Sequence, residues 1–364
     1  MKVLINILSE QRLQNYIAIK HVKPDKVFTL STEAMHDQNV IFSKVSGVKH
    51  IPIKCHGFDY RNLFSATEEI AQKVDRESEV VINYTGGTKI MSTALILRCL
   101  TLFNKPINLI YVNTRDHKIE KLTVKDKGGF GFDSDEIRIK IDIHDCFLLK
   151  GEQLKYYSTE LDKFQKERFA LSEQFISNKA LEIVLKNQKD FFNGKEVKPK
   201  FSEQYGPVKY PISVFFNQNE FAIDLGEEGF RYSHPDGGKY LTGGWLEEYV
   251  YIKLLESGKF DEVAKNILID FKSTTGNLKN IKNEIDVAVS KDVSHIFIEC
   301  KAGEVKQEHL YKLKSLRDYF LGTYGKAFLV SRKEPKPNIK EKAKDLNIEL
   351  IYGKNILNIE KLIK

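Results

Sequence analysis

Short apolar runs alternate with helix-like stretches along the first 115 residues, and this alternation limits the fold more than any other feature of the chain. Strands separated by helices form βαβ units with a parallel sheet, whose ligands bind beyond the carboxyl ends of the strands. The sequence therefore predicts an α/β domain with its functional edge at residues 9–11, 85–89 and 113–115. The predicted strands are Val3 to Leu8, Lys26 to Leu30, Val48 to Ile53, Glu79 to Tyr84 and Ile107 to Val112.

The rest of the chain divides into two further parts. Residues 118–144 alternate in the manner of strands around a Gly-Gly-Phe-Gly turn, which predicts a hairpin that closes a first domain at residues 1–147. Residues 148–240 form a connecting region, helical over 148–190 and mixed afterwards, with β-like runs at 212–216 and 220–225. Residues 241–364 predict a second α/β domain, with helices at 245–256 and 307–320 and strands at 263–271, 284–289, 295–300 and 326–330.

Charge and cysteine content restrict the function classes. The chain carries 57 Lys and Arg against 50 Asp and Glu, and the excess lies in residues 301–364, which suits either a nucleic-acid surface or a solvated basic helix. The 4 cysteines form no CxxC pair, so reduced thiols in a cytoplasm are expected rather than a disulfide framework or a zinc site. No run of 18 apolar residues is present, so no membrane-spanning segment is expected.

A Gly-Gly turn follows the fourth predicted strand, at residues 83–92. Two glycines allow close approach to a ligand, and the amides at the start of the next helix favour an anion. The sequence of this turn matches neither GxGxxG nor GxxxxGK[ST], so it predicts neither a dinucleotide site nor a P-loop. A purely structural connection between strand and helix is the alternative to a ligand site. The candidate ligand residues here are Thr85, Gly86, Gly87, Thr88, Lys89 and Ser92.

Three charged side chains are expected to meet on two neighbouring strands of the second domain. Because alternate residues of a strand share a face, Asp286 lies on the face opposite Val287, and Glu299 and Lys301 lie on one face together. Two carboxylates suit a Mg²⁺- or Mn²⁺-type cation, and the lysine can assist the attack of water on a phosphodiester. A surface ion pair is the alternative for Glu-x-Lys alone. An acid of the preceding helix, Glu247 or Glu248, is the candidate to extend the metal shell.

Other candidate residues have weaker patterns. The histidines lack metal-ligand spacing, and no Gly-x-Ser-x-Gly motif supports a nucleophile. Aromatic residues interleave with basic ones over 306–324, which suits either base stacking beside phosphate contacts or an ordinary helix core.

Taken together, the Gly-Gly loop and the Asp, Glu and Lys set resemble the cyclic-oligoadenylate-activated nucleases of type III CRISPR defence. These join a CRISPR-associated Rossmann-fold (CARF) sensor domain to a restriction-endonuclease-like, PD-(D/E)xK, domain. The resemblance covers most of the chain, except residues 148–240. It implies that Thr85 to Lys89, with Met91 and Ser92, form the sensor's ligand loop, that Asp286, Glu299 and Lys301 are the nuclease's D, E and K, and that Glu247 rather than Glu248 is its additional acid.

The resemblance further implies the ligand and the reaction. The activator would be cyclic tetra-adenylate bound across a homodimer, with Ser9, Gln11 and Asn113 as further contacts, and the reaction would be metal-dependent hydrolysis of DNA, RNA or both. Two rival functions stay open: a ring nuclease that degrades the cyclic nucleotide in the sensor domain, and a nucleotide-responsive DNA-binding regulator without enzymatic activity.

Overall fold

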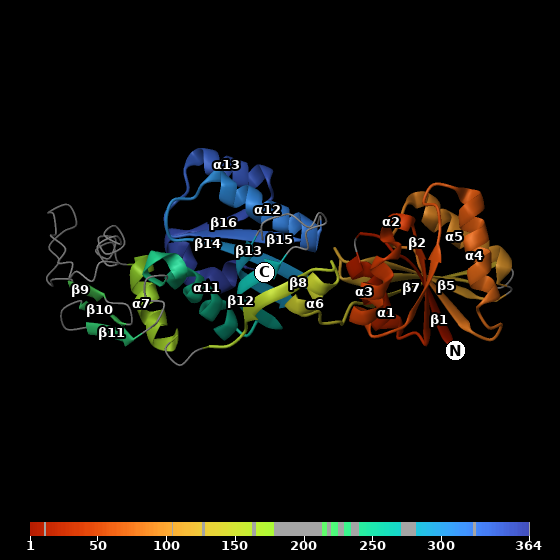
Figure 1. Ribbon diagram of the computed structural model, residues 1–364, viewed down its shortest axis with the longest axis horizontal. Helices are drawn as coiled ribbons and strands as arrows, with labels where there is room; N and C mark the ends of the chain where they lie inside the picture. The colour runs from red at the N-terminus through yellow and green to blue at the C-terminus, as the bar shows by residue number, and fades with distance from the viewer. Residues whose placement is uncertain are drawn as a thin grey trace.

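The computed structural model describes residues 1–10, 12–103, 105–125, 128–161, 165–177, 213–216, 220–224, 229–233, 240–270, 282–322 and 325–363. Two large sheets organise these residues, one of seven strands in the N-terminal half of the chain and one of six strands built mostly from the C-terminal half (Figure 1). A three-stranded sheet of β9 (Ser213–Phe216), β10 (Glu220–Asp224) and β11 (Gly229–Ser233) lies between them in sequence. The mixed α/β architecture agrees with the fold class predicted from the sequence.

The first sheet has the strand order β3-β2-β1-β4-β5-β6-β7. Its first five strands are parallel, and the last two are antiparallel, with β6 and β7 forming the predicted hairpin. The order reverses at β1, so its carboxyl end and that of β4 mark the switch point where ligands of such sheets bind. The strands are β1 (Lys2–Ile7), β2 (Lys26–Ser31), β3 (His50–Lys54), β4 (Glu79–Asn83), β5 (Ile107–Asn113), β6 (Lys118–Val124) and β7 (Phe130–Glu136).

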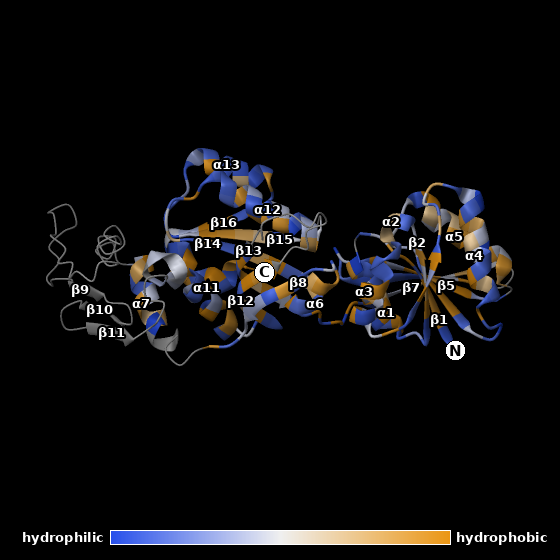
Figure 2. Cartoon of the chain, in the orientation of Figure 1, coloured by the Kyte–Doolittle hydropathy of each residue, from blue (hydrophilic) through white to orange (hydrophobic). Residues whose placement is uncertain are grey.

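Helices cover both faces of this sheet, as in a Rossmann-like domain. One core cluster contains Leu63 of α4 (Tyr60–Gln72) and Met91 of α5 (Lys89–Leu102), and another contains Tyr16 of α1 (Arg12–Val22) and Phe42 of α3 (Gln38–Ser46). The short helix α2 (Glu33–His36) precedes α3. Figure 2 shows apolar residues along strands such as β5 and hydrophilic residues on the outer surface of helices such as α13 (Pro337–Asp345).

The second large sheet has the order β16-β15-β14-β13-β12-β8. Strands β8, β12, β13 and β14 are antiparallel neighbours, whereas β14, β15 and β16 run parallel. The strands are β8 (Gln153–Ser158), β12 (Glu262–Asp270), β13 (Lys282–Lys291), β14 (Ser294–Lys301), β15 (Lys326–Ser331) and β16 (Glu349–Tyr352).

The helices of the second half also pack in two layers. One cluster combines α11 (Trp245–Glu256) with α7 (Gln165–Ser177), the 3₁₀ helix η5 (Gly353–Asn358) and α14 (Ile359–Leu362). The other combines α6 (Ile143–Leu148), α12 (Gln307–Leu321) and α13 (Pro337–Asp345). The sheet lies between them, and the π-helical turn η4 (Tyr240–Gly244) leads into α11. The helices and strands predicted over residues 241–364 are confirmed, whereas α13 and β16 were not predicted.

The expectation of helix throughout residues 148–190 is wrong for β8. Strand β8 pairs with β12, for example through Tyr156 opposite Leu268, and lies at the edge of the sheet. An edge strand tolerates polar residues, so the amino-acid sequence of β8 resembles that of an exposed helix. Helix α7 confirms the expectation for residues 165–177, and the β-like runs near 212–216 and 220–225 are confirmed as β9 and β10. Residues 178–212 lie outside the described residues.

Hydrogen bonds join the two halves at one junction. The amide of Ile141 donates to the carbonyl of Asp292 at 2.9 Å, and the hydroxyl of Tyr16 donates to Asp145 Oδ2 at 2.6 Å. All four cysteines are buried and none forms a disulfide. Over the part of the chain that the structure describes, no helix combines the length and hydropathy that crossing a bilayer requires.

Candidate active site and ligand loop

The carboxylates of Asp286 and Glu299 lie on adjacent strands of the second sheet. Val287 of β13 is opposite Ile298 of β14, so residues 286 and 299, one position further on each strand, share the other face. Both acids are nearly inaccessible, with 5% of Asp286 and 2% of Glu299 exposed. The period-two prediction that placed these acids on one face agrees with this register.

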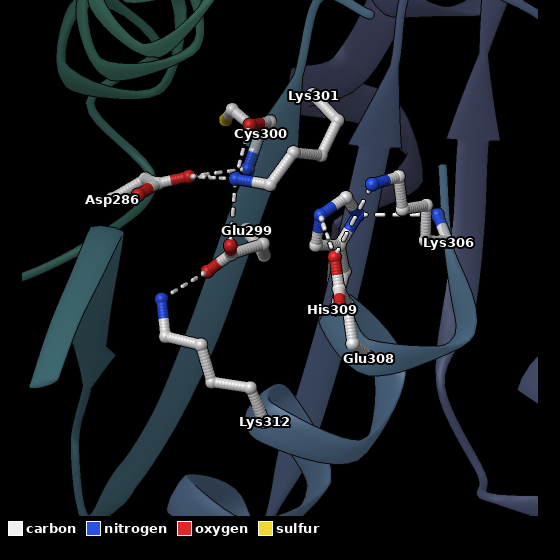
Figure 3. Close-up of polar contacts among 8 residues, drawn as sticks. All are labelled: Asp286, Glu299, Cys300, Lys301, Lys306, Glu308, His309 and Lys312. Atoms are coloured by element: carbon white, nitrogen blue, oxygen red, sulfur yellow. Dashed lines mark hydrogen bonds and ion pairs between the residues drawn. The ribbon is translucent and has the colours of Figure 1, made fainter. Parts of the chain in front are cut away.

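Lys301 connects the two carboxylates (Figure 3). Its Nζ lies 2.6 Å from Glu299 Oε1 and 3.6 Å from Asp286 Oδ2, and it donates to the carbonyl of Cys300 at 3.0 Å. The amide of Cys300 donates to Asp286 Oδ2 at 2.7 Å, which fixes that carboxylate against β14. The Asp, Glu and Lys predicted to meet therefore do so, and because both acids are buried and Lys301 is partly buried they differ from an exposed surface pair.

A second lysine reaches the same carboxylate from α12. Lys312 Nζ lies 3.4 Å from Glu299 Oε2, and about a third of its side chain is exposed (Figure 3). Sequence reasoning grouped Lys312 with basic residues of a nucleic-acid surface and missed this contact. Its position on the helix that follows the Glu-x-Lys strand was the only signal available.

The two adjacent glutamates of α11 have different neighbours. Glu248 pairs with Arg168 of α7, whose Nε and Nη2 lie 2.8 and 3.1 Å from its carboxylate oxygens. Glu247, partly buried, lies close enough to Asp286 to raise the pKa of that carboxyl group. Gly243, at φ 155°, makes the turn before α11 in a conformation open mainly to glycine, next to Ala302. The structure thus places Glu247 beside the buried acids and Glu248 in a separate ion pair.

The electrostatics of this cluster suit a cation. Burial, Glu299 and Glu247 raise the pKa of Asp286 to about 8, against the opposing effect of Lys301. Burial lowers the pKa of Lys301, but Asp286 and Glu299 outweigh it and raise the pKa overall. Three acids thus crowd around positive charge, and carboxylate oxygens are the ligands that Mg²⁺ and Mn²⁺ prefer. Asp286 and Glu299 are therefore suited to hold such a cation, with Glu247 beside them.

The Gly-Gly loop follows β4 and packs against β1. A Cβ on Gly87, whose φ is +82°, would lie 2.4 Å from Ile7 Cγ2, and one on Gly86 would lie 2.8 Å from the carbonyl oxygen of Ile7. Thr88 caps α5 by accepting from the amide of Met91 and donates to the carbonyl of Gly57 at 2.7 Å. Both glycines are thus required by packing, whether or not a ligand binds.

The other predicted ligand residues surround this loop at the carboxyl edge of the sheet. Ser9 lies beside Gly86, since Ser9 Oγ would be 3.1 Å from a Cβ there. Thr85 Oγ1 accepts from the amide of Val112, one residue before Asn113, and donates to Asn83 Oδ1 at 2.6 Å. The edge therefore gathers these three segments as the βαβ pattern predicted.

The remaining predicted ligand residues differ in how exposed they are. Lys89 is exposed, and Ser92 donates to the carbonyl of Thr88 within α5. Met91 is 2% exposed and belongs to the core, so it packs beneath the loop. Asn113 Nδ2 donates to Asp116. Gln11 lies outside the described residues.

A buried amide network beneath the loop was missed by sequence reasoning. Asn83 Nδ2 donates to Asn6 Oδ1 at 3.1 Å and to Asn15 Oδ1 at 3.0 Å, and all three asparagines are fully buried. Asn83 Oδ1 also accepts from Thr85, so the network fixes the start of the loop from below. An asparagine at the end of an apolar strand was the signal, at positions 6 and 83 alike.

The basic and aromatic residues of α12 divide between surface and core. Phe320 is 5% exposed and packs on Phe147, whereas Tyr311 and Tyr319 are nearly half exposed. The core interpretation is thus confirmed for Phe320, and Tyr324 lies outside the described residues.

A separate acidic group lies where the two halves meet. Ligand atoms of Asp142, His144 and Asp145 lie within 4.8 Å of one another. Asp142 caps α6, and Asp145 accepts from Tyr16, so both acids already have structural roles.

Comparisons with known proteins cover nearly the same two halves. The family described as Card1 CARF domain matches residues 3–146, and the family described as Card1-like endonuclease domain matches residues 236–364. The crystal structure of protein VC1899 from Vibrio cholerae is similar at a TM-score of 0.76 and 17% identity, covering 100% of this chain and 97% of that one. Can2 from Sulfobacillus thermosulfidooxidans, in complex with cyclic tetra-adenylate, is similar at a TM-score of 0.71 and 19% identity, covering 100% and 98%. No curated protein matches by sequence.

Proposed function

Because the chain belongs to the Card1 family, with a CARF domain and a Card1-like endonuclease domain, we propose that it is a divalent-metal-dependent nuclease activated by cyclic tetra-adenylate in type III CRISPR defence. The observation that carries the nuclease proposal is the convergence of the buried Asp286 and Glu299 with the partly buried Lys301. The activator proposal draws on the Gly-Gly loop and on the similarity to Can2, whose structure contains that ligand.

In the proposed reaction, Asp286 and Glu299 would hold Mn²⁺ or Mg²⁺, and Glu247 would support the ion. A divalent cation there would polarise the phosphodiester and activate water. Lys301 keeps its charge, since its pKa is raised, so it stabilises negative charge on the phosphate and orients the attacking water. Lys312 places a second positive charge beside Glu299 on the accessible side of the cluster. These residues suit hydrolysis of DNA, RNA or both.

In the proposed activation, Thr85 to Lys89 and Ser9 contact the cyclic nucleotide. A ring of four nucleotides has two-fold symmetry and suits a homodimer in which each protomer contributes one loop. Switching from 1:99 to 99:1 active requires that the ligand prefer the active arrangement by about 5.5 kcal/mol. We expect Lys89→Ala to weaken activation without changing the nuclease cluster, because Lys89 is exposed at the start of α5.

The decisive test is cleavage of supercoiled plasmid, single-stranded DNA and single-stranded RNA with Mn²⁺, with and without cyclic tetra-adenylate. Glu299→Ala should abolish cleavage and retain activator binding, because it removes a cation ligand of the second domain only. Glu304→Ala is the matched control, an exposed acid three residues after Lys301 that pairs with Lys336. Cleavage by Glu299→Ala at the unaltered rate would refute the site.

Two other outcomes would indicate the rival functions. Metal-independent turnover of the activator, unchanged in Glu299→Ala, would indicate a ring nuclease. Ligand-dependent gel retardation of DNA that remains intact would indicate a binding regulator.

A further inference from the structure

A cavity of about 640 Å³ lies at the junction of the two halves, apart from the nuclease cluster and the Gly-Gly loop. Its walls come from α1, from the turn after β5, from the end of α6, and from β13, β14 and α12. Its lining contains none of Asp286, Glu299, Lys301 or the residues 85–92. The volume is within the range of small-molecule sites, which is about 300–1,000 Å³.

The lining combines apolar walls with an excess of positive charge. Leu13, Val293 and Phe320 represent the apolar side, which suits a flat ring. The charged side chains of the lining are one acid and five bases, namely Asp292 against Arg12, Arg115, Lys150, Lys291 and Lys326. A ligand with a ring and an anionic group would complement both parts.

Arg12 is the feature that distinguishes this cavity from an ordinary gap. The residue is only 7% exposed, and its Nη1 donates to the carbonyl of Leu149 at 2.7 Å. Among the residues that the structure describes, its Nε has no hydrogen-bond partner. A buried donor without an acceptor costs about 1–3 kcal/mol, and a phosphate oxygen is the acceptor for which a guanidinium is best suited.

Lys150 adds a second cation beside Arg12. Its Nζ donates to the carbonyl of Glu10 at 3.0 Å and lies 5.6 Å from the ring centre of Tyr319. Neither Arg12 nor Lys150 forms an ion pair with a residue that the structure describes, although Glu10 and Glu152 both lie near Arg12. Burial and Arg12 lower the pKa of Lys150, against the opposing effects of Cys146 and Glu10.

We propose that this cavity is a binding site for a nucleoside monophosphate, with the phosphate on Arg12 and Lys150 and the base against Leu13 and Phe320. The lining contains none of residues 85–92, although Thr114 and Arg115 belong to the predicted ligand edge at residues 113–115. The proposed site does not depend on the proposed nuclease activity. Because its walls come from both halves, a bound nucleotide stabilises their junction.

The test measures binding of AMP to the full chain at low salt by calorimetry, with adenosine and inorganic phosphate as the two part-ligands. AMP should bind at least about tenfold more tightly than either part, since each supplies only one of the two contacts. Equal affinity for phosphate alone would overturn the nucleotide assignment, and equal affinity for adenosine would overturn the anion site.

Three variants locate the binding. Arg12→Gln should weaken the binding of AMP by about tenfold or more, because it removes one charge-assisted hydrogen bond. Leu13→Trp fills the cavity without changing its charge and should weaken the binding of AMP by a similar factor. This variant tests the site if Arg12→Gln fails to fold. Arg138→Gln, an exposed arginine paired with Glu136, is the matched control and should bind normally.

A further variant separates the cavity from the activator loop. Lys89→Ala should bind AMP normally, whatever its effect on activation. Loss of AMP binding in Lys89→Ala with normal binding in Leu13→Trp would overturn the proposal, as would absence of AMP binding to the unmodified chain.

Discussion

The adjacent glutamates of α11 are predicted to respond to the same substitution in opposite ways. Glu248→Gln removes the charge that faces Arg168, whose side chain is 1% exposed and is held at 2.8 and 3.1 Å. Breaking a buried ion pair from one side costs about 3–5 kcal/mol, because the remaining buried charge loses a counter-charge. Cleavage by the folded fraction should remain, since the Asp286 cluster is untouched.

Glu247→Gln removes a charge that repels Asp286 rather than one that stabilises the fold. Its cost in free energy of unfolding should be smaller than that of Glu248→Gln, because the substitution relieves the repulsion between Glu247 and Asp286. Cleavage should fall strongly if Glu247 supports the cation. The two variants differ in position by one residue and are identical in chemistry, so each is the control for the other.

Trp245 supplies the assay, because it is the only tryptophan of the chain and is fully buried at the start of α11. Its fluorescence during urea unfolding reports on the helix that carries both glutamates. Glu248→Gln should lower the urea midpoint by about 1–3 M for a typical dependence of stability on urea. An unchanged midpoint in Glu248→Gln, or full cleavage by Glu247→Gln, would refute the division of roles.

Three further predictions concern the rest of the molecule. Burial lowers the pKa of His50 to about 4, so protonation favours the unfolded chain. The first domain should therefore lose about 2 kcal/mol of folding free energy between pH 7 and pH 5. Urea titrations at the two pH values should show a smaller loss for His50→Gln. Gly87→Ala should lower the melting temperature, through a cost of about 1–3 kcal/mol for backbone strain alone, whereas normal melting would contradict the packing of the loop. Lys312→Met should reduce cleavage by about tenfold or more by removing positive charge beside Glu299, and Lys314→Met, whose lysine pairs with Asp318, should cleave normally.

The acids and lysine of the candidate site could be predicted because their geometry is local. The alternation of a strand places Asp286 and Glu299 on chosen faces, and a hairpin between β13 and β14 then brings those faces together. The same holds for the loop after β4, since parallel strands end at one edge of the sheet. In both places a short-range rule plus the neighbouring strand was sufficient.

The residues that support these sites could not be predicted, because each depends on a partner far away in the chain. Arg168 meets Glu248 across 80 residues, and Asn83 meets Asn6 across 77. Strand β8 illustrates the same limit for secondary structure. Its sequence is polar and resembles that of a helix, but it forms a strand because it pairs with β12, more than a hundred residues later. The sequence does not show which acid will pair with a buried arginine. The environments of Glu247 and Glu248 therefore differ only once α7 packs against α11. Their separation in the unfolding and cleavage assays would therefore test the tertiary packing and not the motif.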